Sequence, residues 1–156
     1  MALIDDAIAG LKAKSIEKPN VVPPPTQDQI TDAEAKLGIK FPPSYITFLK
    51  SAGSNEMRDW ETYWVGDDSL GERNIVKANA SEREDTASTL PAYLIAFHKN
   101  GCGDLFCFDM RRPDQDGEYP VVFWDQELTA EENLQDLFPI SHNFADWLMQ
   151  EVQEHD

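Results

Sequence analysis

The chain has 156 residues, and its 29 acidic and 13 basic residues give a formal net charge of −16 at pH 7. A field of this sign repels phosphate backbones and anionic lipid, so we expect no direct binding to nucleic acid or to a membrane. The length predicts a single folded domain with a core of useful size.

The negative charge is concentrated in the last third of the chain. Residues 1–50 hold six acidic and six basic side chains, whereas residues 101–156 hold fourteen acidic side chains against Arg111 and Arg112. This distribution favours a basic partner, because opposite charge accelerates the encounter of two proteins. A surface that only keeps the protein soluble is the alternative that composition leaves open.

Three observations predict a cytoplasmic location. The segment Met1–Lys14 contains two acidic residues and lacks the basic start of a signal peptide. No apolar run approaches the roughly 20 residues that a membrane-spanning helix needs. The only cysteines, Cys102 and Cys107, lie in one predicted hairpin, where cysteine usually serves as a small hydrophobic residue in a reduced protein.

The first 25 residues predict a helix followed by an extended strap. Apolar residues recur at helical spacing over residues 3–14, which predicts an amphipathic helix. Four prolines between Ser15 and Pro25 exclude a helix there and favour an extended linker. We therefore divide the chain into an N-terminal helix with its strap, residues 1–25, and one domain, residues 26–152.

Two short helices are predicted over residues 26–53. Thr26 and Gln29 stand at the two positions of a capping box, and Gly38 suits the left-handed residue that ends a helix. The Pro42–Pro43 pair suits the first turn of the second helix. Each helix carries an apolar stripe that would face the body of the protein.

The middle of the chain predicts a strand and then a less regular stretch. Residues 60–65 alternate in a way that is typical of a strand, with Trp60 and Trp64 on one face. Residues 66–89 are the least periodic part of the sequence. We predict a loop there with a short helix over residues 70–79, followed by a mobile surface segment.

The core is predicted at residues 93–110. Two apolar runs, Tyr93–His98 and Asp104–Met110, flank a turn that contains two glycines, which indicates an antiparallel hairpin. Both faces of both runs are apolar, as in central strands that are covered on both sides.

The last part of the chain predicts one more strand and one more helix. Pro120–Trp124 is typical of a strand, and residues 126–136 are predicted to form an acidic loop. Ser141 is predicted to cap a final helix with an apolar inner face. The sequence thus predicts an α+β fold, with a central, mostly antiparallel twisted sheet of about 4–6 strands and helices packed around it.

The segment TQDQITDAEAKLGIKFPPSYITFLKSAG resembles the opening of the SUKH superfamily of Smi/Knr-like proteins. That family pattern is an acidic helix, then Leu-Gly-x-x-x-Pro-x-x-Tyr-x-x-Phe-Leu and a small turn. The matching residues here are Glu34, Leu37, Gly38, Pro42, Tyr45, Phe48, Leu49, Gly53 and Asn55. Three later motifs match in order: Gly103, Asp104, Phe106, Phe108 and Asp109; Pro120, Val121, Val122, Trp124 and Asp125; Ser141, Phe144, Trp147 and Leu148.

The sequence offers little support for a catalytic or metal-binding site. Cys107 and His98 could approach across the hairpin, but a thiol inside an apolar strand has a raised pKa and is inert. A zinc site would find only three ligands there, His98, Cys102 and Cys107. The segment Asp114–Glu118 contains a fragment of a calcium loop, which an ordinary turn explains as well. We expect no enzyme, no cofactor and no metal.

The resemblance implies an immunity-type protein that binds and neutralises a bacterial polymorphic toxin, often a basic nuclease, as a monomer or weak dimer. The partner would meet acidic loops at one end of the sheet, with Trp60 as a partly exposed apolar anchor. The acids assigned to this interface are Asp67, Asp68, Asp114, Asp116, Glu118 and Asp125. The alternative is a regulatory or scaffolding interaction module of the same fold without a toxin partner.

Overall fold

The computed structural model describes residues 2–16, 23–52, 55–57, 60–84 and 88–155. These ranges contain seven helices and one sheet of five strands. The first half holds α1 (Leu3–Lys14), α2 (Gln27–Leu37), α3 (Pro43–Ser51), β1 (Trp60–Thr62), the 3₁₀ helix η1 (Asp68–Arg73) and α4 (Ile75–Glu84). The second half holds β2 (Leu94–Asn100), β3 (Leu105–Asp109), β4 (Val121–Trp124), α5 (Ala130–Gln135), β5 (Pro139–Ser141) and α6 (Phe144–Glu154).

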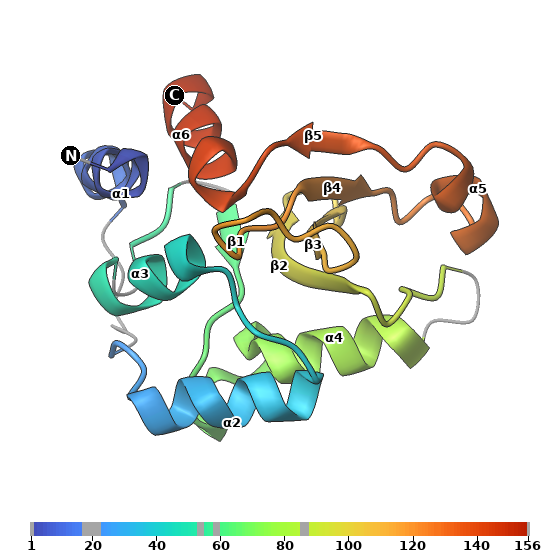
Figure 1. Cartoon of the computed structure of the whole chain (residues 1–156), viewed down its shortest axis with the longest axis horizontal. Coiled ribbons are helices and arrows are strands. Elements are labelled where there is room, and N and C mark those ends of the chain that lie inside the picture. The colour runs from blue at the N-terminus through green and yellow to red at the C-terminus, as the bar shows by residue number, and fades with distance from the viewer. Residues whose placement is uncertain (1, 17–22, 53–54, 58–59, 85–87, 156) are drawn as a thin grey trace.

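The sheet has the order β1-β2-β3-β4-β5, and every neighbouring pair is antiparallel. The predicted α+β fold with a mostly antiparallel sheet is therefore confirmed. Helices cover both faces of this sheet (Figure 1): α4, with α2 beneath it, lies on one side, and α3 and α6 lie on the other. The hairpin of β2 and β3 sits in the centre of the sheet, as its two apolar faces predict.

A bulge in β2 changes which side chains face α6. Ala96 pairs with Cys107 and His98 pairs with Phe106, so Phe97 is an extra residue between them. Strict alternation would send Phe97 and His98 to opposite faces, but both rings contact Trp147 of α6, at 4.8 and 5.0 Å between centroids.

The bulge is tied to the opposite helix layer by one buried amide. The Asn79 side chain of α4 accepts from the backbone N–H of Ala96 at 2.8 Å and donates to its carbonyl at 2.9 Å. A bulge leaves backbone groups without a ladder partner, and burying them unpaired would cost free energy. Asn79, which is completely buried, satisfies both groups and fixes α4 on the sheet.

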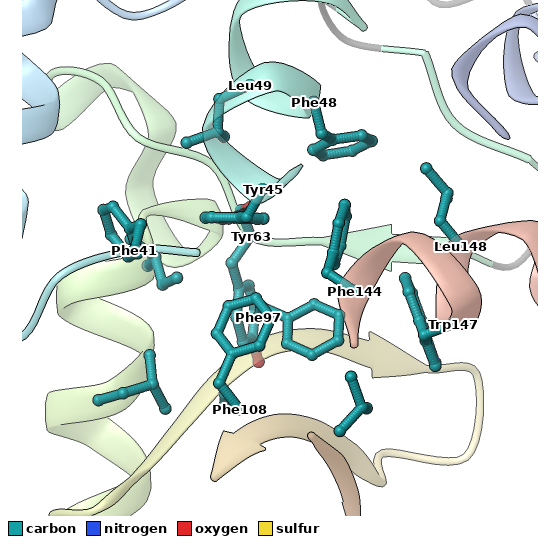
Figure 2. Packing of buried hydrophobic residues seen from close by; sticks show 14 of the residues in the cluster. Phe41, Tyr45, Phe48, Leu49, Tyr63, Phe97, Phe108, Phe144, Trp147 and Leu148 are labelled. Atoms are coloured by element: carbon teal, nitrogen blue, oxygen red, sulfur yellow. Dashed lines mark hydrogen bonds between the residues drawn. The ribbon is translucent and has the colours of Figure 1, made fainter. Parts of the chain in front are cut away.

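The core is built around Tyr45, which is completely buried (Figure 2). Its ring lies 5.3 Å from each of Phe41, Phe108 and Phe144, in edge-on geometries. Its hydroxyl donates to the carbonyl of Tyr63 at 3.0 Å, so the buried polar atom is satisfied. The aromatic positions of the family pattern are therefore packing positions, which explains why they predict the fold.

The first helix packs on the last one. Adding a Cβ at Gly10 of α1 would place it 2.7 Å from Cγ1 of Val152, so the glycine permits a close approach to α6. The ammonium group of Lys14 donates to the carbonyl of His155 at 2.7 Å. The strap after α1 falls partly outside the described residues, and the division into residues 1–25 and 26–152 stays a prediction.

Several predicted helix ends match the structure and others do not. Thr26 and Gln29 form the capping box of α2, and Gly38 ends that helix with φ = 71°. The prediction that Ser141 caps the final helix is wrong: Ser141 lies in β5, and Asn143 caps α6 by accepting from the N–H of Asp146. Gly53, assigned to the turn after α3, lies outside the described residues.

The less periodic regions contain more structure than predicted. Residues 68–84 form η1 and α4, so the helix extends into the segment predicted to be mobile; residues 85–87 lie outside the description. The strand predicted over residues 60–65 ends at Thr62, and Trp64 makes only an isolated bridge to Asn74. The acidic loop of residues 126–136 contains α5, which opens with a capping box of Thr129 and Glu132.

Candidate functional site

Trp60 is buried, so the prediction of a partly exposed anchor is wrong. Only 4% of its surface is exposed, and its ring lies 6.0 Å from that of Trp147 and 4.7 Å from that of His98. Its indole N–H donates to Glu151 Oε1 at 3.2 Å. Helix α6 covers the β1 edge at this point, which the sequence of β1 alone does not reveal.

The predicted site residues Asp67 and Asp68 are exposed at the start of η1. The carboxylate of Asp67 accepts from the backbone N–H of Ser69 at 2.9 Å, and the hydrogen bonds from Ser69 lower the pKa of Asp67. Asp68 forms an ion pair of 3.4 Å with Lys77 of α4. Both acids are available at the surface, although each has a partner in the described part of the chain.

The other predicted acids before β4 form a structured turn, residues 113–118. Asp114 Oδ1 accepts from the backbone N–H groups of Asp116 and Glu118, at 2.8 and 3.0 Å. Glu118 reaches helix α3, where its two carboxylate oxygens accept from the N–H and hydroxyl of Ser44, at 2.9 and 2.6 Å. Gly117 provides the positive φ of 77° that this turn needs. Glu118 is thus a helix cap as well as a surface charge.

Asp125 does not share an end of the sheet with this turn. Leu105 pairs with Trp124, whereas Phe108 pairs with Val121, so Asp125 follows β4 at the end where β3 begins. The turn of residues 113–118 joins β3 to β4 at the opposite end. The prediction that all six acids lie at one end of the sheet is wrong, because the whole length of β4 separates Asp125 from the acids of the turn. Contact of these acids with a partner stays a prediction.

Asp125 belongs instead to a surface made by α5, β5 and the loops around them. A hollow of about 290 Å³ opens there, and its walls include Phe123, Leu128, Phe138 and Ile140. Asp125 and Asp136 lie at its margin. We name this region, residues 123–141, the α5–β5 surface; in Figure 1 it forms the end of the molecule farthest from α1. Sequence reasoning missed it, although the apolar run Leu137-Phe138-Pro139-Ile140 inside an acidic stretch was a signal.

The buried thiol and imidazole lack the arrangement of a nucleophile and its base. Burial raises the pKa of Cys107, and burial, with the charge of Arg73, lowers the pKa of His98 to about 3. His98 Nδ1 lies 3.1 Å from the hydroxyl of Thr62, and its ring faces Trp147. Cys107 is completely buried, and its pKa responds to Glu82 and Arg83 of α4, on the opposite side of the sheet.

The described residues were also compared with the requirements of a metal site and of a membrane-spanning helix, and they meet neither. Among the described residues, no group of three or more His, Cys, Asp and Glu side chains is placed to hold a metal ion. Within the same ranges, no helix is both long enough and apolar enough to cross a membrane.

Nearly the whole chain matches one known family. Residues 4–153 match the family model SUKH_5, described as SMI1-KNR4 cell-wall, which confirms the resemblance seen in the sequence. A crystal structure of a protein from Pseudomonas syringae pv. tomato superposes with a TM-score of 0.67 at 18% identity, covering 92% of this chain and 93% of that one. This likeness supports the fold alone. A comparison with curated proteins found no significant match.

Proposed function

Since this chain belongs to the SUKH family of SMI1-KNR4-like proteins, we propose that it is a non-catalytic protein-binding module that acts as an immunity protein. It binds a bacterial polymorphic toxin and covers the basic face with which the toxin grips its substrate. The protein works in the cytoplasm, as a monomer or weak dimer. A nuclease is the toxin class that fits best, because a nuclease must carry a basic face to bind phosphates.

The observation that carries this proposal is the concentration of negative charge in the last part of the chain, in a family of protein-binding domains. No lysine or arginine follows Arg112, and this last part of the chain supplies β4, α5, β5 and α6. A basic active face would be drawn to these elements from a distance, with association accelerated by about 10- to 1,000-fold at low salt. An acidic protein seated there would also exclude phosphate backbones by like charge.

The buried groups agree with a binding role. The polar side chains in the core hold the fold together: Asn79 fixes the bulge, and Thr62 engages His98. The acids near the surface, in contrast, are numerous and mostly solvated. Immunity by occlusion needs complementary charge and a shaped surface, and it needs no reacting group.

The test is capture followed by reconstitution. The tagged protein is used as bait in lysate of its native host, bound proteins are released with salt, and each is assayed as a toxin with and without the purified chain. We expect one stoichiometric basic polypeptide whose toxic activity is abolished at a 1:1 ratio. Capture of ordinary cellular proteins without an effect on any activity would contradict the proposal and favour the regulatory or scaffolding alternative.

A further inference from the structure

The α5–β5 surface exposes an unusual amount of apolar side chain. Phe138 is 65% exposed, Leu134 42% and Ile140 37%, and these are three of the five large hydrophobic residues exposed in the described ranges. Phe138 and Ile140 line the hollow, and Leu134 lies on α5 beside it. Scattered apolar residues are normal on a surface, but exposed ones that gather at a hollow mark a contact site. The other two, Leu3 and Ile16, lie near the two ends of α1 and are not among the residues that line this hollow.

The hollow continues the aromatic core of the sheet. Phe106 of β3 lies under Trp147 of α6, with ring centroids 5.4 Å apart. Phe123 of β4 packs edge-on against Phe106, also at 5.4 Å, but it is only half-buried and forms part of the hollow. The apolar face of the sheet therefore extends beyond the reach of α6. Phe138, which directly precedes β5, and Ile140 within β5 complete it.

The walls of the hollow are held in place before any partner arrives. The buried side chain of Asn133 in α5 accepts from the N–H of Asp125 at 2.9 Å. The same side chain donates to the carbonyls of Asp125 and Thr129, at 2.9 and 3.2 Å. These bonds fix α5 against the end of β4. A preformed site loses less conformational entropy on binding than a flexible one.

The segment that surrounds the hollow is acidic, and residues 123–141 contain no lysine or arginine. Asp125 and Asp136 lie at the margin of the hollow, and Glu127 and Glu131 are exposed on the loop and helix beside it. Within the described residues, none of these four carboxylates forms an ion pair. Their charge is therefore available to a partner that carries lysine or arginine around an apolar residue.

We propose that the α5–β5 surface docks a basic protein segment, with one aromatic or large aliphatic side chain in the hollow and lysine or arginine side chains facing the surrounding acids. This inference rests on the proposed function and names the surface that meets the toxin. An apolar anchor inside a ring of polar contacts is the usual form of an interface hot spot.

The structure argues against the other occupants. A strand added to β5 would find only three residues, one of them Pro139, and short edges with proline resist such pairing. A second copy would bring two acidic surrounds together, which like charge opposes. The volume of about 290 Å³ lies at the lower limit of small-molecule pockets, which span about 300–1,000 Å³, and suits a single side chain.

The test maps two synthetic peptides onto the ¹⁵N-labelled full chain by NMR. The probes are the amidated, acetylated peptides Lys-Lys-Phe-Lys-Lys and Lys-Lys-Ala-Lys-Lys. We expect shifts at residues 123–141 and about tenfold tighter binding of the Phe peptide, as burial of a Phe side chain predicts. Equal binding of the two peptides, or shifts confined to the turn of residues 113–118, would overturn the proposal.

Two matched variants test the same surface with the captured toxin as the ligand. Phe138→Ala should weaken toxin binding by roughly 30-fold, the effect of truncating a hot spot, with an unchanged melting temperature because the ring is largely exposed. Leu3→Ala removes an exposed hydrophobic residue from α1 and should change neither quantity.

The outcomes separate this inference from the proposed function. Full inhibition of the toxin by Phe138→Ala would leave the immunity role standing and overturn the docking surface. Peptide shifts at residues 123–141, together with a capture from native host lysate that yields no toxin, would support the docking surface and contradict the immunity role. A dimer in sedimentation that Phe138→Ala dissolves would overturn the docking proposal in favour of self-association.

Discussion

Two acidic regions of this protein differ in what their carboxylates do. In the turn of residues 113–118, Asp114 closes the backbone and Glu118 caps α3 through Ser44. On the α5–β5 surface, Glu127, Glu131 and Asp136 are exposed, and their carboxylates make no hydrogen bond or ion pair within the described residues. Asp114 and Glu118 therefore use their charge to hold the fold, whereas Glu127, Glu131 and Asp136 leave theirs free beside an apolar hollow.

This difference indicates which acids of a strongly acidic protein are available for a partner. The number of acids in a segment does not distinguish the two regions, because both are rich in them. The carboxylates that already accept backbone or helix-terminus hydrogen bonds are partly committed. Free carboxylates around exposed apolar side chains offer both the steering charge and the desolvated contact that association needs.

The largest effect should come from reversing charge on the α5–β5 surface. We expect the triple variant Glu127→Lys, Glu131→Lys and Asp136→Lys to weaken toxin binding by about 100-fold at low salt, or about 2.7 kcal/mol. Stability should change little, because lysine is less favourable in the first turn of α5 but more favourable at its C-terminus. The measurement is binding kinetics over a salt series.

A matched triple variant controls for net charge. Asp6→Lys, Glu61→Lys and Glu72→Lys change the charge equally at exposed positions of α1, β1 and η1, outside the α5–β5 surface. This control should alter the association rate several-fold less than the α5–β5 triple. Equal losses in the two variants would mean that total charge, and no particular surface, governs binding.

The second effect concerns the turn. Glu118→Ala removes both hydrogen bonds to Ser44 at the start of α3, and we expect the free energy of unfolding to fall by about 2 kcal/mol. Toxin affinity of the folded variant should change less than twofold. Urea titration and calorimetry measure the two quantities. A stable variant with a large loss of affinity would reverse the roles assigned to the two regions.

The third effect is a pH dependence of stability that arises from the buried His98 and involves neither acidic region. His98 has a folded-state pKa near 3 against about 6.5 when unfolded, because burial disfavours its charged form. The unfolded chain therefore binds the extra proton first as the pH falls through 6.5. Stability is complete above that value and should fall by about 1.3 kcal/mol between pH 7 and 5.5.

The variant His98→Gln should lose this pH dependence, although its overall stability is lower. The exposed His142 provides the control, because His142→Gln should keep the slope of the natural protein. Denaturant titrations at pH 7, 6 and 5.5 measure the effect. A slope that His98→Gln leaves intact would assign the acid sensitivity to surface carboxylates instead.

The smallest effect is expected at Asp116, an exposed acid of the turn. Its carboxylate makes no hydrogen bond in the described ranges, and Asp116→Lys should change the unfolding free energy by less than about 0.5 kcal/mol. Toxin association should slow by less than threefold, as expected for a distant steering charge. A larger kinetic effect would restore the turn as part of the interface.

The sequence predicts the parts of this fold that local chemistry decides. The capping box of Thr26 and Gln29, the left-handed Gly38 and the central hairpin follow from side-chain hydrogen bonding, glycine geometry and apolar patterning. These features involve residues close together in the chain. Their spacing within a known family pattern also identifies the family.

Features that depend on distant contacts escaped prediction. The bulge at Phe97 is stabilised by Asn79 of another element, and the burial of Trp60 depends on α6. The separation of Asp125 from the turn is a different case, because the predicted strand Pro120–Trp124 already places the turn and Asp125 at opposite ends of the sheet. Helix α5 could also have been predicted from the sequence, because Thr129 and Glu132 stand at the two positions of a capping box.

Amide hydrogen exchange of the chain alone and in complex with the captured toxin would show whether the toxin binds at the α5–β5 surface. We expect slower exchange on binding that is concentrated in residues 123–141, where α5 and β5 surround the apolar hollow. Protection of residues 113–118 or of α2, with residues 123–141 unchanged, would contradict it.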